Sequence, residues 1–198
     1  ATGEAVAVLT PYSAADVVDD GAFMSEAEVE RALTLLGRKK NLVLQGAPGV
    51  GKTFLAKKLA HAWIGAVDPA RVFAVQFHPS FTYEDFVRGY RPTGEAGKFA
   101  LRDGPFVRAC QTAAANPEQP HVMLVDEINR AHLSQVFGEL FQLLEPDKRG
   151  KANGVTPLYP RTDDELLWVP ENLYVIGTMN IADRSLALVD FALRRRFA

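Results

Sequence analysis

Short apolar runs and amphipathic patterns alternate along this chain. Four apolar runs, each bounded by polar or turn-forming residues, are typical of buried strands: residues 41–46, 71–77, 121–125 and 173–178. Between the first two, Leu55, Leu59 and Trp63 recur at helical spacing and predict a helix packed beneath a sheet. A strand, a helix and another strand in this order predict parallel pairing, because a helix-length crossover returns the chain in the same direction. We therefore expect an α/β fold with a mostly parallel central sheet.

Three further helices are predicted. Ser25 and Glu28 have the spacing of a capping box, so a helix is expected to begin at this point and to end near Gly37. A short helix is expected over residues 106–115. A longer one, ending before Pro146, has its apolar residues on one face: Leu133, Val136, Phe137, Leu140 and Leu144.

Three segments do not follow this alternation. The opening residues, through Asp20, show no periodicity, and residues 1–40 as a whole lead into the sheet. Residues 78–105 mix aromatic, charged and glycine residues, which indicates an insertion with little regular core. Residues 147–170 are rich in glycine, proline and charge. Within them, residues 166–169 predict one arm of a surface hairpin, whose role the sequence does not indicate.

Composition narrows the class of protein. With 198 residues, 47% of them hydrophobic and 23% charged, the chain can bury one sizeable core, as a soluble globular domain does. Its 22 basic and 24 acidic residues leave no basic footprint, so tight nucleic-acid binding by this segment is not expected. Any contact with DNA is expected to be local, or to come through missing domains or a partner.

Cysteine and histidine usage excludes several kinds of site. Cys110 is the only cysteine, which rules out an internal disulfide and a cysteine-based zinc site and fits a reducing cytosol. We interpret Cys110 as a small buried hydrophobe on a helix. The histidines are too scattered for the spacing of metal ligands: His61, His78, His121 and His132.

The apolar runs indicate where the protein is located, and the chain ends indicate whether the chain is complete. No run is long enough to cross a bilayer, and no charged-then-apolar signal opens the chain, so we expect a cytoplasmic protein without membrane contact. The first residue is not Met, and Ala198 directly follows an arginine cluster, so we also expect the chain to be part of a longer protein.

The stretch that joins the first predicted strand to the next helix carries the strongest chemical signal. Residues 46–53 fit the phosphate-loop pattern G-x-x-x-x-G-K-[ST]. Glycines let main-chain N–H groups approach a phosphate closely, and the helix start adds the positive end of its dipole. Lys52 is predicted to neutralise phosphate oxygens, and the Thr53 hydroxyl to bind Mg²⁺. The expected nucleotide contacts here are Gly46, Pro48, Gly49, Val50, Gly51, Lys52, Thr53 and Phe54.

Polar residues end two later strands. Asp126 and Glu127 follow an apolar run and leave the strand end in different directions, because side chains alternate along a strand. Asp126 is predicted to reach the Mg²⁺ shell, and Glu127 to polarise a water for attack on the γ-phosphate. Asn180 is predicted to point into the same crevice and either to orient that water or to sense the γ-phosphate. Taken alone, an acidic pair or an asparagine at a strand end is also typical of a simple turn.

Several further segments belong to one known pattern: residues 76–81, 83–86, 89–92, 126–131, 179–180, 182–185 and 193–197. With the phosphate loop, they resemble the AAA+ NTPases, and more narrowly the McrB-like motor subunits of modification-dependent restriction systems. The chain departs from the McrB pattern at Ile181, where that pattern has threonine, so a role for a hydroxyl at this position is not supported.

The resemblance implies an AAA+ type three-layer sandwich over residues 1–198, with the family's helical lid absent from this chain. It implies that Asn180 is the first sensor. It also implies a ring, usually hexameric, in which Arg195, with Arg196 beside it, reaches into the neighbouring subunit's site. In AAA+ proteins the base lies against the segment before the phosphate loop, here near Val17 and Val18. The McrB resemblance implies GTP as substrate, and the wider class implies ATP.

Three functions are compatible with these residues. The first is a ring motor that hydrolyses GTP or ATP with Mg²⁺ and drives a nuclease subunit of the McrC type, with DNA recognition supplied elsewhere. The second is an ATPase similar to the MoxR type, which remodels or activates protein complexes. The third is a nucleotide-binding assembly module without turnover, which the presence of Glu127 and Asn180 disfavours. For the arginines, a solvated basic helix end is the simpler alternative.

Overall fold

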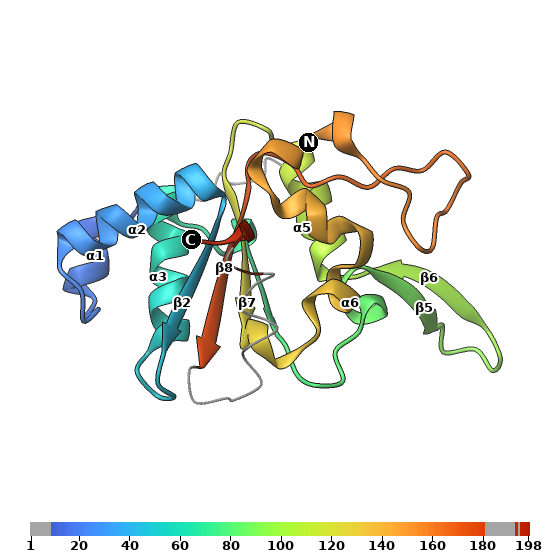
Figure 1. The fold of residues 1–198 in the computed structure, drawn as a ribbon, viewed down its shortest axis with the longest axis horizontal. Helices are drawn as coiled ribbons and strands as arrows, with labels where there is room; N and C mark the ends of the chain where they lie inside the picture. Colours follow the sequence, from blue (N-terminus) through green and yellow to red (C-terminus); the bar gives the residue numbers. More distant parts are fainter. Residues whose placement is uncertain (1–8, 181–192, 194) are drawn as a thin grey trace, which may run out of the picture.

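Four parallel strands form the central sheet of the structure, a computed structural model that describes residues 9–180, 193 and 195–198. The strands are β2 (Asn41–Gly46), β4 (Val72–Gln76), β7 (His121–Asp126) and β8 (Leu173–Asn180). They lie in the order β2–β8–β7–β4, so β8 is inserted between β2 and β7 (Figure 1). The register places Gly46 opposite Asn180, and Gln76 opposite Asp126. The predicted parallel sheet is confirmed, and the carboxyl ends of its strands lie at one edge.

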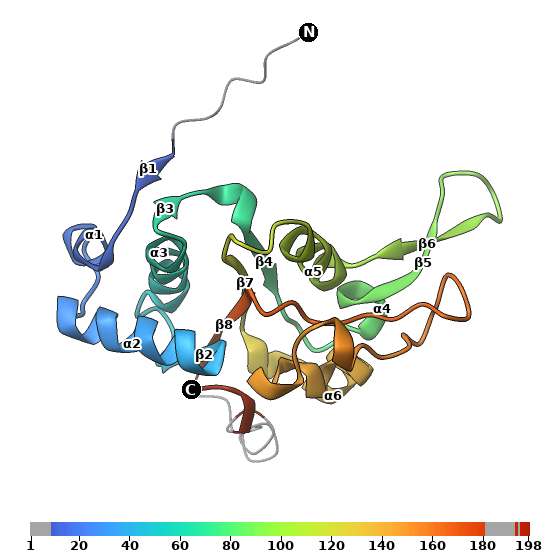
Figure 2. The ribbon, with the colours of Figure 1, turned by 90° about the horizontal axis from the view of Figure 1, so that it is seen from above.

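Helices cover both faces of this sheet and complete three layers (Figure 2). One face carries α1 (Ala14–Asp19), α2 (Glu26–Lys39) and α3 (Lys52–Ile64), and the other carries α5 (Pro105–Ala115), α6 (Leu133–Phe137) and the 3₁₀ segment η3 (Gly138–Leu144). Val122 and Leu124 of β7 join the core beneath the first set, whereas Met123 and Val125 join the core beneath the second. Because both faces are buried, β7 is a continuous apolar run. The predicted three-layer α/β sandwich is confirmed.

The capping box predicted before the first long helix is present at the start of α2. The Glu28 carboxylate accepts hydrogen bonds from the Ser25 N–H and hydroxyl, both at 2.8 Å. The expected end at Gly37 is wrong, because α2 continues to Lys39, beyond which the backbone turns left-handed. Gly37 instead permits close packing, since a Cβ at this position would lie 2.8 Å from the Trp63 ring of α3.

The opening residues contain regular structure that their sequence pattern does not predict. The helix α1 precedes α2, and β1 (Thr10–Pro11) pairs with β3 (Ala66–Val67) beyond the end of α3. Asp20 fixes α1 against α3, because its carboxylate accepts from the Tyr12 hydroxyl and lies 2.5 Å from Lys58 Nζ. These contacts join residues far apart in the sequence, which periodicity within one window does not detect.

The apolar face predicted for residues 133–144 is buried, but the segment is not one continuous α-helix. It ends its α-helical part at Phe137 and continues as η3. Gly138 breaks the helix with φ 54° and ψ −133°, a conformation that glycine adopts at low cost. The Tyr83 ring lies 2.8 Å from the position of a Cβ on residue 138, so glycine also allows α4 (Tyr83–Phe86) to approach.

Residues 78–105 form a folded unit, so the expectation of little regular core is wrong. They contain α4 and the antiparallel hairpin of β5 (Arg88–Pro92) and β6 (Phe99–Asp103), which projects from the rest of the fold (Figure 2). The Arg88 side chain at the hairpin base is completely buried. Its guanidinium lies 2.6 Å from Asp103 and makes a bidentate pair with Glu165 at 2.7 and 2.8 Å. A buried cation is tolerated when it is paired and hydrogen-bonded in this way.

The segment 147–170 is mostly irregular, and the predicted hairpin arm is reduced to one bridge. Main-chain hydrogen bonds join Val155 and Leu167 in both directions, at 2.9 and 2.8 Å. The ion pair of Glu165 with Arg88 attaches this segment to the hairpin of β5 and β6. Short 3₁₀ turns of the described chain include η1 (Pro69–Arg71), η4 (Pro146–Lys148) and η5 (Lys151–Asn153).

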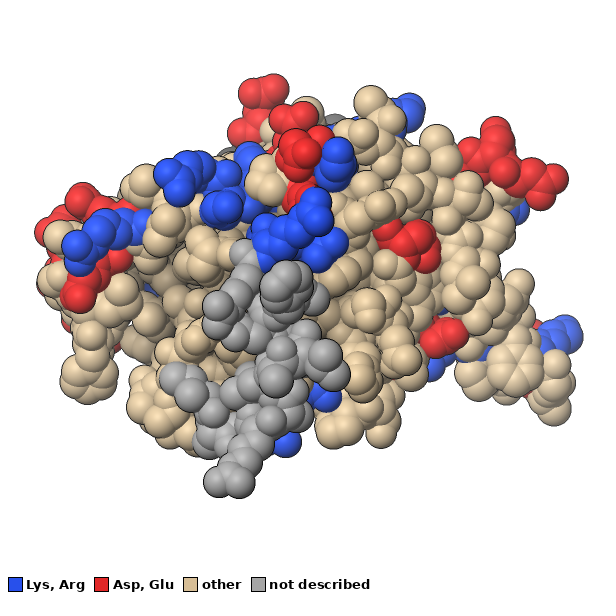
Figure 3. Space-filling model, in the orientation of Figure 1, with Lys and Arg blue, Asp and Glu red and all other residues tan. Residues whose placement is uncertain are grey.

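Charged side chains of both signs share the surface. On the face shown in Figure 3, basic side chains gather near the middle, with acidic side chains directly beside them and at both ends. No broad basic surface is visible on this face, which fits the formal net charge of −2. Across the described ranges, no helix combines the length and the apolar character needed to span a bilayer.

Candidate functional site

The loop between β2 and α3 lies at the carboxyl end of β2. Gly49 and Gly51 have φ values of 79° and 81°, which favour glycine. Gly46 ends the strand, and a Cβ at this position would approach the Val50 side chain to 3.2 Å. Lys52 is the first residue of α3, so the unsatisfied N–H groups of the helix start adjoin the loop. The chain therefore runs as strand, glycine loop and helix start, the arrangement that binds phosphate.

The side chain of Lys52 folds back over this loop. Its ammonium group donates to the carbonyl oxygens of Gly46 and Ala47, at 3.1 and 2.7 Å. An ammonium is a compact positive charge with three donors. These contacts hold that charge beside the loop N–H groups, and both kinds of donor suit phosphate oxygens.

The carboxylate that ends β7 meets the start of α3. Thr53 Oγ donates to the two carboxylate oxygens of Asp126, at 3.0 and 3.1 Å. The hydroxyl of Thr178, on β8, donates to the same carboxylate. A hydroxyl and a carboxylate side by side supply the hard oxygen ligands that Mg²⁺ prefers, so Thr53 and Asp126 fit a magnesium site.

Glu127 leaves the strand through a left-handed backbone conformation, with φ 52° and ψ 45°. Its carboxylate accepts from Asn180 Nδ2 at 3.2 Å and from Gln76 Nε2 at 3.5 Å. It also lies 3.8 Å from Arg130 in the 3₁₀ turn η2 (Ile128–Arg130). A non-glycine residue in this region costs roughly 1–3 kcal/mol, and such residues cluster at active sites as well as at helix ends. The left-handed conformation at Glu127 directs its carboxylate away from that of Asp126, so the two carboxylates have different neighbours.

One cavity of about 410 Å³ joins these groups. It is lined by Pro48, Gly49, Gly51, Lys52, Thr53, Asp126, Glu127, Thr178 and Asn180. All but Thr178 are residues that the sequence patterns single out. Thr178 is two positions before Asn180, so the two-residue period of a strand could have indicated it. Gln76 was also missed, because its contact with Glu127 depends on the pairing of β4 with β7.

A second, more apolar pocket adjoins this cavity at the loop. It is lined by Gly21, Ala22, Phe23, Met24, Gly49, Val50, Gly51, Phe54 and Leu55. Of the predicted nucleotide contacts, Val50 and Phe54 lie here with exposed side chains. Val17 is fully buried and Val18 packs against the same core, and neither is among the lining residues. Contact of a base with these two valines stays a prediction.

Arg195 and Arg196 lie beside Glu145 and are not among the residues that line the cavity. Arg196 Nη2 is 3.1 Å from Glu145, its Nε donates to the Phe141 carbonyl at 3.1 Å, and its guanidinium lies 4.1 Å from the Phe141 ring centre. Arg195 Nε is 3.4 Å from the same carboxylate, and its side chain is 73% exposed. Ile181 and the pattern at residues 182–185 lie outside the described residues.

Buried hydrogen bonds anchor these arginines to the strand that precedes the phosphate loop. Asn41 Nδ2 donates to the Arg196 carbonyl at 2.8 Å, and Arg149 donates to Asn41 Oδ1 at 2.7 Å. The Ala198 N–H donates to the Asn41 carbonyl at 3.0 Å, and the Ala198 carbonyl accepts from Val43 at 2.9 Å. Strand β2 thus carries the loop at one end and positions the arginine pair at the other.

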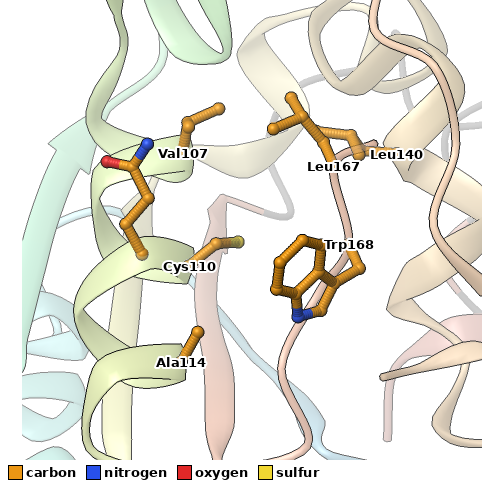
Figure 4. A pocket seen from close by; sticks show the side chains of 7 residues that line it. Val107, Cys110, Ala114, Leu140, Leu167 and Trp168 are labelled. Atoms are coloured by element: carbon orange, nitrogen blue, oxygen red, sulfur yellow. The ribbon is translucent and has the colours of Figure 1, made fainter. Parts of the chain in front are cut away.

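Another cavity is mostly apolar and shares no lining residue with the phosphate cavity (Figure 4). It is lined by Val107, Cys110, Gln111, Ala114, Leu140, Leu167 and Trp168. Burial raises the pKa of the Cys110 thiol to about 12, so Cys110 is not a nucleophile at neutral pH. Its interpretation as a small buried hydrophobe is confirmed. Within the part of the chain that is described, no group of three or more His, Cys, Asp or Glu side chains could hold a metal ion.

The family follows from comparison with known proteins. The family model for the AAA domain of the dynein-related subfamily matches residues 41–197, which include the loop, both carboxylates and the arginines. The chain belongs to this AAA family. Family membership agrees with the P-loop AAA+ fold found here.

Two curated relatives indicate which members of the AAA family this chain resembles. The chain is 51% identical over 187 residues to the type IV methyl-directed restriction enzyme EcoKMcrB subunit of Escherichia coli K12, covering 94% of this chain and 40% of that protein. It is 30% identical over 193 residues to the type II restriction enzyme BsuMI component YdiS of Bacillus subtilis 168, covering 80% of this chain and 56% of that protein. The chain is thus McrB-like and spans about half the length of these relatives.

A solved structure supports the fold alone. The crystal structure of a candidate ATPase from Cytophaga hutchinsonii matches 86% of this chain and 43% of its own, with a TM-score of 0.50 and 21% identity. The likeness agrees with the arrangement of the sheet and its covering helices.

The role of Glu127 is testable by a single substitution. Glu127→Gln keeps the shape and the acceptor for Asn180, but loses the basic oxygen that takes a proton from water. We expect nucleotide binding within about twofold of wild type and a turnover about 10²- to 10⁴-fold lower. Fluorescent-nucleotide titration and phosphate release measure the two effects separately.

The matched control is Glu118→Gln, an exposed glutamate beyond the end of α5. It should bind and turn over nucleotide as the wild type does. Turnover of Glu127→Gln at the wild-type rate would exclude Glu127 as the base.

Proposed function

We propose that this chain is the motor domain of a ring-forming enzyme that hydrolyses the β–γ phosphoanhydride bond of GTP or ATP with Mg²⁺. The observation that carries the proposal is the single cavity in which Lys52, Thr53, Asp126, Glu127 and Asn180 meet. They supply a cation, two metal-binding groups, a base and an amide that holds the base. A phosphate-binding cation, metal-binding groups and a residue that activates or positions the nucleophile recur in phosphoryl-transfer sites.

The loop and Lys52 bind the phosphates. Lys52 exchanges the carbonyl oxygens of Gly46 and Ala47 for phosphate oxygens, which form stronger, charge-assisted hydrogen bonds. Thr53 and Asp126 would hold Mg²⁺, which when bound would supply positive charge beside the phosphate oxygens. The hydroxyl and carboxylate are already 3.0 Å apart, so little rearrangement is needed to share one ion.

Glu127 takes the proton of the attacking water, and Asn180 orients its carboxylate. Glu127 Oε1 accepts from Asn180 at 3.2 Å. The contacts of Oε2 with Gln76 and Arg130 are longer, at 3.5 and 3.8 Å. A contact of 3.5 Å lies at the limit of hydrogen-bond length, so Asn180 is the stronger partner of the carboxylate.

The base of the nucleotide occupies the apolar pocket beside the loop. This pocket shares Gly49 and Gly51 with the phosphate cavity, so a nucleotide whose phosphates lie in one extends into the other. Phe23 and Phe54 offer exposed aromatic surface to the base. Asn180 does not read the base, because it is bound to Glu127 in the phosphate cavity. We favour GTP, which the McrB likeness implies, over ATP.

Arg195 acts on the nucleotide of the adjacent subunit, and Arg196 anchors the segment that carries Arg195. The Arg196 guanidinium is engaged by Glu145 and Phe141 within its own subunit, whereas the Arg195 side chain is 73% exposed. The fixed fork of donors on a guanidinium suits the spread negative charge of a transferring phosphoryl group. Supply of Arg195 in trans makes a homo-oligomeric ring, for which we propose six subunits, part of the catalytic unit.

The motor drives a nuclease. Both curated relatives are components of restriction enzymes, which supports a partner nuclease subunit of the McrC type. The formal net charge of −2 and the mixed surface charge support recognition of DNA by other domains or by that partner.

Nucleotide preference is decided by competition. Unlabelled GTP and ATP are titrated against one fluorescent triphosphate analogue bound to the full-length protein with Mg²⁺. We expect GTP to displace the analogue at a concentration at least about tenfold lower than ATP does, a difference of about 1.4 kcal/mol. A clear preference for ATP would count against the McrB-like function and favour a remodelling ATPase.

The action of Arg195 in trans is tested by mixing two inactive variants. Arg195→Ala should lose on the order of 10³-fold or more in turnover, and Lys52→Ala should lose triphosphate binding. In mixed rings, some interfaces pair an intact loop with an intact arginine, so activity should reappear at intermediate ratios.

Arg108→Ala removes an exposed arginine on α5 and serves as the control, with expected wild-type turnover. Size measurements establish that mixed rings form. Mixed rings as inactive as their two components would exclude the assignment of Arg195.

A further inference from the structure

One buried hydroxyl contacts both acidic residues of the site. Thr178 is only 3% exposed. Its Oγ accepts a hydrogen bond from the Glu127 N–H at 3.1 Å and donates to Asp126 Oδ1. An N–H group only donates, and a carboxylate accepts, so the direction of both hydrogen bonds follows from their chemistry.

The contact replaces main-chain pairing where the two strands part. The β7–β8 ladder ends with Val125 opposite Gly177, one residue before Asp126 and Thr178. Glu127 then turns left-handed, so its N–H leaves the ladder and needs another acceptor. The Thr178 hydroxyl is that acceptor.

The same hydroxyl restricts the orientation of the Asp126 carboxylate. Asp126 is held between Thr178 on β8 and Thr53 on α3, with Thr53 Oγ 3.0 and 3.1 Å from its two oxygens. Removal of the Thr178 hydroxyl leaves Thr53 as the remaining hydroxyl that bonds to Asp126 within the part of the chain that the structure describes. It also leaves the Glu127 N–H without its acceptor, beneath the turn that directs the Glu127 side chain toward Asn180.

We propose that Thr178 is a positioning residue, whose one hydroxyl orients both the metal-binding carboxylate of Asp126 and the basic carboxylate of Glu127. The proposal rests on the proposed function and adds a residue that acts through two others. A residue that only fills space in the sheet would be replaceable by one of the same shape, whereas a positioning hydroxyl is not. Valine and serine separate these cases, because valine keeps the shape of threonine and serine keeps its hydroxyl.

The test compares Thr178→Val and Thr178→Ser in the full-length protein. We expect Thr178→Val to bind triphosphate without Mg²⁺ within about twofold of wild type. Its turnover should fall at least tenfold, and its half-saturating Mg²⁺ concentration should rise severalfold. Thr178→Ser should recover most of both properties. The control, Thr112→Val, removes a hydroxyl that bonds within its own helix, at 3.0 Å from the Arg108 carbonyl, and should change neither.

A double-variant measurement keeps the proposal testable if Thr178→Val is unstable. In wild type, Thr178→Ala, which also removes the hydroxyl, should raise the half-saturating Mg²⁺ concentration; in an Asp126→Asn background it should cause no further change in Mg²⁺ dependence, because the carboxylate through which the hydroxyl acts is gone. Wild-type turnover and an unmoved Mg²⁺ titration for Thr178→Val would overturn the proposal. A wild-type protein that binds and hydrolyses no triphosphate would instead overturn the proposed function, which is tested before the variants are compared.

Discussion

The parallel register of the four central strands is the constraint on which the site depends. Gly46 lies opposite Asn180, and Gln76 opposite Asp126, so the polar residues that end separate strands meet at one edge. None of these residues reaches the others through local chain geometry. A shift of one strand by a single residue would turn its side chains to the other face and separate them. The apolar packing on both sides of the sheet therefore fixes the chemistry, because it fixes the register.

The elements that the sequence predicts correctly are those with a local cause. The strands are continuous apolar runs, and α2 begins at a capping box whose two members are three residues apart. The incorrect predictions concern residues whose role depends on distant partners. Gly37 does not end α2, because it packs on Trp63, and Gly138 interrupts a predicted helix where Tyr83 approaches. The buried ion pair of Arg88 with Glu165 holds the segment 147–170 in place, although that segment has few regularly spaced apolar residues.

In the candidate site, too, the residues with a local role are predictable and those that depend on distant partners are not. The phosphate-loop residues and the acidic pair are recognisable because each performs its task within a short stretch of chain. Gln76 is not predicted because strand pairing alone brings it close to Glu127, and Thr178 is indicated only by its position two residues before Asn180 on the same strand. The two arginines connect to the site through β2, since Asn41 holds the Arg196 carbonyl at the opposite end of the strand from Gly46. A family likeness names such residues, and the structure gives the contacts through which they act.

We propose that the cavity between the loop and the strand ends holds the phosphates of a nucleoside triphosphate. The most direct measurement is an experimental structure of the full-length protein with Mg²⁺ and a non-hydrolysable triphosphate. Lys52 Nζ should have left the carbonyl oxygens of Gly46 and Ala47, now 3.1 and 2.7 Å away, to contact the phosphates. Thr53 and Asp126 should share the Mg²⁺ ion. Phosphates bound elsewhere, with Lys52 still on the loop carbonyls, would contradict the account.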